Sequence, residues 1–350
     1  QGALTTSTIT ASGNLAVNSN GGDVSLGASI VSGNLTMQSG NGNVTQKGQL
    51  VVTGDTSVAA GTGTISLMDA LNNFGGSLAL QGTSTSVATT GNLQLASVTN
   101  TGPMTLLAPK GSIDLGSAFI TGGDLTLQSR DNMNLGGANI TGSLNMSSTT
   151  GTVSFGQATV TGDLTAATNG KQVDLGSANV GGNLSVQTYG GNVVQQAPTT
   201  SNPSSALHVN GTSTINAGTG NVSLPNIPNQ FGGTVSLLAN DVVLVGSSGL
   251  TFGASTVTGN LNVKAASGNV TQIGVMQVAG NSTFTATQGD VLLTQANTFA
   301  QSVSVGAVNA TINAVSALAL GTSTVTGTLK VDVAQGDLTQ TGPQIGRAHV

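Results

Sequence analysis

Apolar and polar residues alternate in short stretches along the chain, and the alternation repeats every 20 residues. The repeat is clearest between residues 113 and 193, where apolar side chains recur at fixed places in each unit. Two of these columns are Ile113, Met133, Val153, Val173 and Val193, and Leu115, Leu135, Phe155 and Leu175. Each unit holds three alternating stretches, which is typical of half-buried strands. Glycines recur between the stretches and predict corners.

A single 20-residue unit cannot bury its apolar face alone, whereas stacked units can. The pattern therefore predicts an all-β fold, a three-sided parallel β-solenoid with about 20 residues per coil and on the order of 15 coils. The alternation places aliphatic side chains inward and Thr, Ser and Asn outward. Asp114, Asp174, His208 and Lys264 each follow and precede an apolar residue, so we expect them to point outward.

A second, longer repeat lies above the first. Gln195 breaks the Leu115 column, and it ends one copy of a Gly-Asn-Val-Thr-Gln motif. The copies occupy residues 42–46, 191–195, 268–272 and 336–340. We expect one continuous solenoid region over residues 1–343, with modules beginning near residues 43, 192, 269 and 337, and an inserted loop at 197–205. Residues 344–350 abandon the Thr/Ser/Gly/Asn style and match a translated sequencing adapter, which predicts a non-native tail.

Composition narrows the classes of function. The 350 residues include 52 Gly, no Cys, no Trp and only 5% charged residues, with a net charge of −5 and a mean hydropathy of +0.18. Identical charges stacked in register would repel, whereas Thr, Ser and Asn can hydrogen-bond to their neighbours. Scattered basic residues argue against nucleic-acid binding, and no apolar run is long enough to predict a membrane span.

Few residues offer chemistry. Arg130 and Asp131 are adjacent at an expected corner, where a charged pair is normally a solvated surface feature. Asp114 and Asp174 share a column but lie three coils apart, further than the roughly 5–10 Å of paired glycosidase carboxylates. His208 has no expected partner for base catalysis. We therefore expect no catalytic residues, no cofactor and no enzyme activity.

Other local motifs are interpreted as corners. Gly21-Gly-Asp23 and Gly122-Gly-Asp124 are single fragments of a calcium-binding repeat. Gly61-Thr-Gly63 and Gly218-Thr-Gly220 lack the ending of a phosphate-binding loop. We therefore expect no metal site.

Two further motif types were weighed. Five Asn-x-Ser/Thr sequons are attributed to chance matches in alternating Thr strands: Asn34, Asn43, Asn145, Asn183 and Asn269. Thr121, Thr141 and Thr161 form one column of the kind seen in ice-binding solenoids. Gly181 ends that column, so ice binding is a lesser alternative.

The motifs Ser-Gly-Asn-Leu-Thr (residues 32–36), Gly-Asn-Val-Thr-Gln and Asn-Phe-Gly-Gly (residues 73–76) resemble those of large bacterial exoproteins of the filamentous haemagglutinin type. The resemblance covers nearly the whole chain. It implies a right-handed β-helix and an adhesin secreted by a two-partner or autotransporter-like route. The chain begins at Gln1 without a start Met, so we expect a fragment of the repeat region of a longer protein.

The resemblance also implies partners and location. We expect a non-catalytic adhesive segment, outside the bacterial cell or on its surface, that acts as a rod or a multivalent binding surface. Its partners would be glycans or proteins of a host or neighbouring cell, together with an outer-membrane secretion partner for the full-length protein. A carbohydrate-active β-helix protein is the main alternative.

Overall fold

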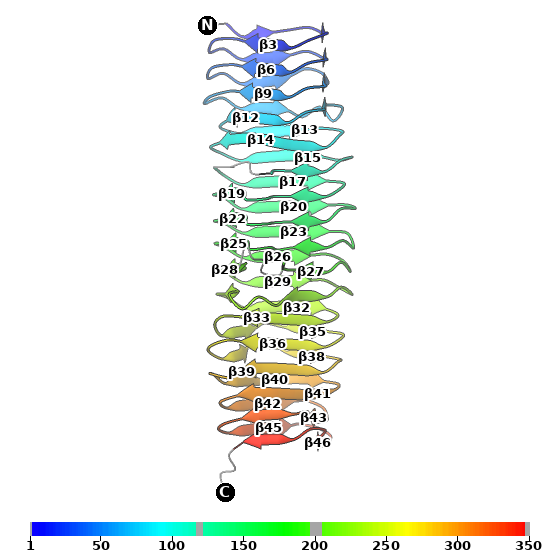
Figure 1. Cartoon of the computed structure of the whole chain (residues 1–350), viewed down its shortest axis with the longest axis vertical. Coiled ribbons are helices and arrows are strands. Elements are labelled where there is room, and N and C mark those ends of the chain that lie inside the picture. Colours follow the sequence, from blue (N-terminus) through cyan, green and yellow to red (C-terminus); the bar gives the residue numbers. More distant parts are fainter. Residues whose placement is uncertain (1, 117–121, 197–204, 347–350) are drawn as a thin grey trace. The chain divides into compact units, whose positions relative to one another are not determined.

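The computed structural model describes residues 2–116, 122–196 and 205–346 and consists of two compact units, residues 1–168 and 169–350. The described residues contain short strands and no helix, and every strand pairing is parallel. The strands make about 16 turns of about 20 residues, which confirms the predicted all-β parallel β-solenoid. Figure 1 shows strands lying one coil apart within each unit, for example β3, β6 and β9.

The first unit has three stacks of strands, and each strand pairs with the one about 20 residues later. One stack is β1 Leu4–Thr5, β4 Val24–Leu26, β7 Val44–Gln46, β10 Ile65–Leu67, β13 Thr85–Ala88, β15 Met104–Ala108, β17 Leu125–Ser129, β20 Leu144–Ser148 and β23 Leu164–Thr168. Another is β3 Leu15–Asn18, β6 Leu35–Gln38, β9 Thr56–Ala59, β12 Leu78–Gly82, β14 Leu93–Asn100, β16 Ile113–Asp114, β18 Met133–Asn134 and β21 Val153–Ser154. The shortest strands are β2 Ile9–Ala11, β5 Ser29–Val31, β8 Leu50–Val52, β11 Asn73–Phe74, β19 Asn139–Ile140 and β22 Thr159–Val160.

The second unit is built in the same way. One stack is β24 Val173–Asp174, β27 Val193–Val194, β30 Val222–Leu224, β33 Val242–Gly246, β36 Leu261–Ala265, β39 Ser282–Ala286, β41 Ser302–Ala307, β43 Leu318–Leu320, β44 Ser323–Val325, β46 Leu338–Gln340 and β47 Gln344–Gly346. Another is β26 Leu184–Gln187, β29 Ser213–Asn216, β32 Val235–Ala239, β34 Leu250–Phe252, β35 Ser255–Val257, β37 Val270–Gln272, β38 Met276–Val278, β40 Val291–Phe299, β42 Ala310–Ala314 and β45 Leu329–Val333. A short stack holds β25 Asn179–Val180, β28 His208–Val209 and β31 Gln230–Phe231.

The core is a set of inward columns, as the alternation predicts. One coil buries six apolar side chains almost completely: Met133, Leu135, Ala138, Ile140, Leu144 and Met146. Met133 lies between Ile113 and Val153 in register, so each column packs residues of the same kind upon one another. At about 1.5–3 kcal/mol for each large aliphatic side chain, burial within a coil stabilises that coil and its neighbours locally.

Glycine at one corner is required by the stacking. Gly136 has φ of 56°, and a Cβ there would overlap the carbonyl oxygen of Gly116. The same place is held by Gly156, with φ of 55°. An L side chain would therefore meet both backbone strain and the preceding coil, which explains the glycine column in the 20-residue repeat.

Buried amide pairs explain the longer repeat. Gln46 and Asn72 exchange two hydrogen bonds of 2.9 Å, from Gln46 Nε2 to Asn72 Oδ1 and from Asn72 Nδ2 to Gln46 Oε1. Asn72 Oδ1 also accepts the backbone N–H of Leu50, and its Nδ2 donates to the carbonyls of Leu67 and Ala88. One fully buried Asn thus joins three successive coils at a corner.

The same pair recurs in the other two modules. Gln195 pairs with Asn229, and Gln272 pairs with Asn297, each through two hydrogen bonds of 2.7–2.9 Å. Gln195, which breaks the apolar column in the sequence, is therefore an inward residue with 6% of its surface exposed. The sequence motifs identify the glutamines, but their asparagine partners were not predicted.

The remaining boundary predictions have different outcomes. The expected loop at 197–205 lies outside the described residues except for Ser205, which is buried and accepts a hydrogen bond from Gln195 Nε2. In the expected tail, Gln344–Gly346 forms β47 beside β44, and residues 347–350 lie outside the described residues. The predictions of one continuous region and of a non-native tail stay predictions.

Candidate binding surface

A column of small polar side chains runs along one stack of the first unit. The second residue of each strand points outward, and all nine members are exposed or half-buried. The column consists of Thr5, Ser25, Thr45, Ser66, Ser86, Thr105, Thr126, Asn145 and Thr165, paired in register from coil to coil. Neighbouring strands lie about 4.8 Å apart. This polar column therefore repeats one kind of hydrogen-bonding group at a constant short interval.

The second unit carries shorter polar columns. Asn262, Thr283 and Ser304 follow one another on β36, β39 and β41. The same column contains the half-buried Val194 and Val243 in earlier coils, which interrupt it. The uninterrupted polar column of the first unit is therefore the more regular surface.

Hydrogen-bonded ladders of Asn and Asp follow the corners. In the first unit, Asn14 Oδ1 accepts the backbone N–H of Asn34 at 2.9 Å, and Asn34 Oδ1 accepts that of Asp55 at 3.0 Å. Asp55 Oδ1 in turn accepts the backbone N–H and the hydroxyl of Ser77. These two bonds hold the pKa of the Asp55 carboxyl below its ordinary value, with the backbone bond as the larger cause.

A corresponding ladder in the second unit runs through five corners. Its side-chain oxygens accept backbone N–H groups one coil on at 2.7–3.1 Å, in the order Asn192, Asn221, Asp241, Asn260 and Asn281. The ladders satisfy backbone donors at corners, where no strand partner is available. Most corner Asn and Asp side chains thus have a structural role.

The charged residues considered for catalysis are bound into corners. Arg130 is exposed, its carbonyl accepts the Thr150 N–H, and Asp131 Oδ1 accepts the Thr150 hydroxyl at 3.1 Å. Asp114 and Asp174 are half-buried and accept the N–H groups of Gly116 and Gly176 at 2.8 and 3.0 Å. Both carboxylates therefore stabilise positive-φ turns of their own coils.

The remaining single residues lie on outward positions. His208 is half-buried between the buried Leu207 and Val209, as predicted, and pairs in register with Asn179 and Gln230. Lys264 is exposed, as expected. Among the described residues, no group of three or more His, Cys, Asp or Glu side chains could hold a metal ion.

The glycine motifs form turns. Gly61 and Gly218 have φ of 59° and 61°, and Gly122 has φ of 118°. Gly63 and Gly220 donate their N–H groups back to Ala60 and Ala217 at 2.8 and 3.0 Å. The geometry matches the interpretation of these segments as corners.

The Thr column considered for ice binding is only partly described. Thr121 lies outside the described residues, whereas Thr141 and Thr161 are exposed. Their hydroxyls donate to the backbone carbonyls of Gly122 and Thr141. These hydroxyls thus bind the preceding coil.

The five sequon asparagines are all exposed. Asn34, Asn43, Asn183 and Asn269 lie at corners, where their Oδ1 atoms accept backbone N–H groups of the next coil. Asn145 lies within β20, in the polar column. The corner asparagines are therefore explained by the ladders.

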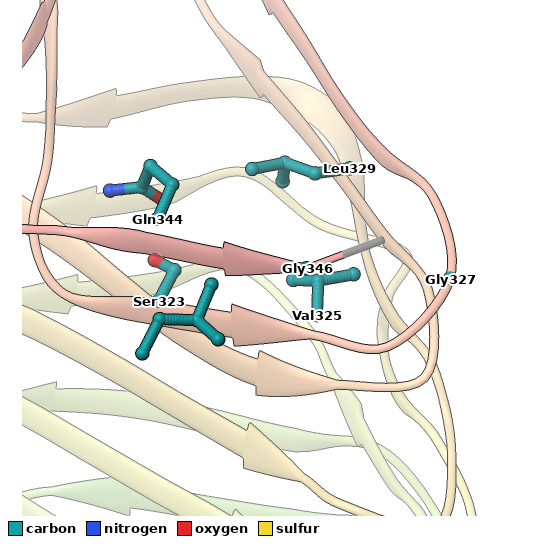
Figure 2. Close-up of a pocket in the computed structure, with 7 residues that line it drawn as sticks. Ser323, Val325, Gly327, Leu329, Gln344 and Gly346 are labelled. Atoms are coloured by element: carbon teal, nitrogen blue, oxygen red, sulfur yellow. The ribbon is translucent and has the colours of Figure 1, made fainter. Parts of the chain in front are cut away.

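One hollow of about 290 Å³ lies beside β44 and β47. Figure 2 shows Ser323 and Gln344 on these neighbouring strands, with Val325 and Leu329 nearby. Gln344 Nε2 donates to the carbonyls of Gly321 and Gly342, while its buried Oε1 has no partner in the described part of the chain. The hollow is lined by small and apolar side chains and by no ionisable group.

The fold and these surfaces define a repeat protein of the parallel β-solenoid class. The family model described as "Repeats of unknown function (DUF5649)" matches residues 12–81, 122–179, 161–238, 239–306 and 307–346, and the chain belongs to this family. No curated protein and no solved structure gave a match. Among the described residues, no helix is long and apolar enough to cross a membrane.

Proposed function

We propose that this chain is a non-catalytic segment of a long bacterial adhesin, outside the cell or on its surface. The polar column from Thr5 to Thr165 carries the proposal, because it offers the same small donor and acceptor groups on nine successive coils. Each contact with a glycan or protein surface would be weak. Several contacts along one rigid stack would combine into useful avidity.

Local stacking supports a structural role beside the adhesive one. Each coil is stabilised by its neighbours, so further coils extend the surface without a new core. In this proposal the segment acts as a rod, a multivalent surface or both. The full-length protein would leave the cell with the help of an outer-membrane secretion partner, as in the exoproteins that the motifs resemble.

A matched pair of triple variants tests the adhesive surface. In the first, Thr105, Thr126 and Thr165 of the polar column are replaced by Val. In the control, Thr10, Thr36 and Thr99, which point outward from other strands, receive the same replacement. Binding of the full chain and both variants is measured on a glycan array and on cultured epithelial cells.

We expect the polar-column variant to lose about tenfold or more in apparent affinity, while the control stays within about twofold. Equal loss in both variants, or no binding of the parent chain above background, would overturn the adhesive proposal. Incubation with soluble polysaccharides tests the alternative, since a fall in viscosity would identify a carbohydrate-active protein.

A further inference from the structure

Four Asn–Gly pairs occur in the chain, and all four asparagines are exposed: Asn20, Asn41, Asn169 and Asn210. An Asn followed by Gly is the sequence most open to spontaneous deamidation, because Gly has no side chain to hinder attack by its own nitrogen. The reaction requires that nitrogen to be free of other bonds. The four pairs differ in this respect.

Two of the pairs are held by the coil ladder. Gly170 donates its N–H to the carbonyl of Thr188 at 2.7 Å, and Gly211 donates to the carbonyl of Gly182 at 2.9 Å. To attack, each nitrogen must first break a hydrogen bond to a neighbouring coil, which requires local opening. The fold thereby protects Asn169 and Asn210.

The other two pairs lie in corners where the glycine nitrogen is not in the ladder. Within the described part of the chain, Gly21 N–H donates no hydrogen bond, and Gly42 N–H makes only a long contact of 3.4 Å with the carbonyl of Ser39. We propose that Asn20 and Asn41 are sites of spontaneous deamidation in the folded protein, with Asn20 the faster of the two.

The chemistry needs only water and hydroxide. Hydroxide removes the proton from the glycine nitrogen, which attacks the Asn side-chain carbon Cγ. The new N–Cγ bond closes a five-membered succinimide as the Cγ–Nδ2 bond breaks, and Nδ2 leaves as ammonia after taking a proton from water. One water molecule then opens the ring at either carbonyl, giving aspartate or isoaspartate and one added negative charge.

Corner geometry explains why these reactive pairs exist. Asn20 has φ of 51° and Gly21 has φ of 116°, so the turn requires a residue that tolerates positive φ followed by glycine. Gly40, Gly61 and Gly218 hold the place of Asn20 in other corners, with φ of 59–76°. The backbone requirement of the corner therefore selects the sequence that deamidates.

Peptide mapping of the intact chain tests this proposal. The full chain is held at mildly alkaline pH and physiological temperature, sampled over time and digested with trypsin. Cleavage after Lys47, Arg130, Lys171 and Lys264 places Asn169 and Asn210 on separate peptides, whereas Asn20 and Asn41 share one and are distinguished by fragmentation. Mass spectrometry measures the deamidated fraction, and enzymatic methylation of isoaspartate identifies the isomer.

We expect Asn20 and Asn41 to react at least about tenfold faster than Asn169 and Asn210 in the folded chain. In strong urea, all four rates should converge, because the difference comes from the fold. Asn20→Gly and Asn41→Thr copy residues found at the same places in other corners, and each should abolish the reaction at its own site only. Equal rates in the folded chain, or faster reaction at Asn169 or Asn210, would overturn the proposal.

Discussion

Gln272 and Asn297 lie 25 residues apart in the sequence and exchange two buried hydrogen bonds of 2.8 and 2.9 Å. Asn297 Oδ1 also accepts the N–H of Met276, and its Nδ2 donates to the carbonyl of Asn313. One amide thus satisfies polar groups of three coils inside an otherwise aliphatic core. The arrangement recurs in each of the three modules that contain a pair.

Removing one member of the pair should destabilise the solenoid. Asn297→Ala leaves the Gln272 amide and the Met276 N–H without partners in a buried place, so the free energy of unfolding should fall by about 2–4 kcal/mol. Urea denaturation followed by circular dichroism measures the change. Gln277→Ala removes an exposed amide from the neighbouring strand and should cost less than about 0.5 kcal/mol. Equal costs would contradict the role of the pair.

Two adjacent glycines should respond in opposite ways to alanine. Gly136→Ala places a Cβ against the Gly116 carbonyl at φ of 56°, and we expect a loss of about 1–3 kcal/mol. Gly137 has open space around its expected Cβ, so Gly137→Ala should be neutral or stabilise by up to about 1 kcal/mol. The thermal midpoints of the two variants give the comparison, and a destabilised Gly137→Ala would argue against the steric explanation.

Buried hydroxyls provide a test of hydrogen-bond satisfaction. Ser282 is 1% exposed and its Oγ has no partner in the described structure, whereas Ser255 Oγ donates to the Gly253 carbonyl and accepts the Leu237 N–H. Ser282→Ala should therefore stabilise by about 1 kcal/mol, and Ser255→Ala should destabilise by about 1 kcal/mol. Chemical denaturation distinguishes the two directions, and a loss of stability in Ser282→Ala would show that its hydroxyl has a partner.

Asp55 should make stability depend on acidic pH. Its folded-state pKa is lowered, so its contribution is present above the unfolded value of about 3.8 and is lost as pH falls through the lower folded value. Asp55→Asn keeps an oxygen to accept the Ser77 N–H but cannot titrate. The denaturation midpoint of the parent, measured from pH 5 to pH 2, should therefore fall more steeply than that of the variant. Parallel curves would contradict this assignment.

A charge placed inward or outward should have very different effects. Val153 is fully buried between Met133 and its other core neighbours, so Val153→Asp should cost about 4 kcal/mol or more and unfold adjacent coils. Ser154 is half-buried beside Asn134 and points outward, so Ser154→Asp should be tolerated. Hydrogen exchange across β18, β20 and β21 measures local opening. Similar exchange in both variants would contradict the assigned faces.

The sequence by itself determined the class of fold, the coil length and the direction of most side chains. It could do so because parallel stacking brings a residue against its own counterpart 20 residues later, so that Met133 meets Val153 and the contact becomes a period in the sequence. The glycine corners follow for the same reason.

Only the tertiary structure decided the amide partners and the two kinds of Asn–Gly pair. Gln46, Gln195 and Gln272 meet their asparagines after 26, 34 and 25 residues, because corner length differs between modules. No constant period can connect such residues. Whether Gly21 or Gly211 donates its N–H likewise depends on where a carbonyl of another coil lies, and the local sequences Asn20-Gly21 and Asn210-Gly211 are identical.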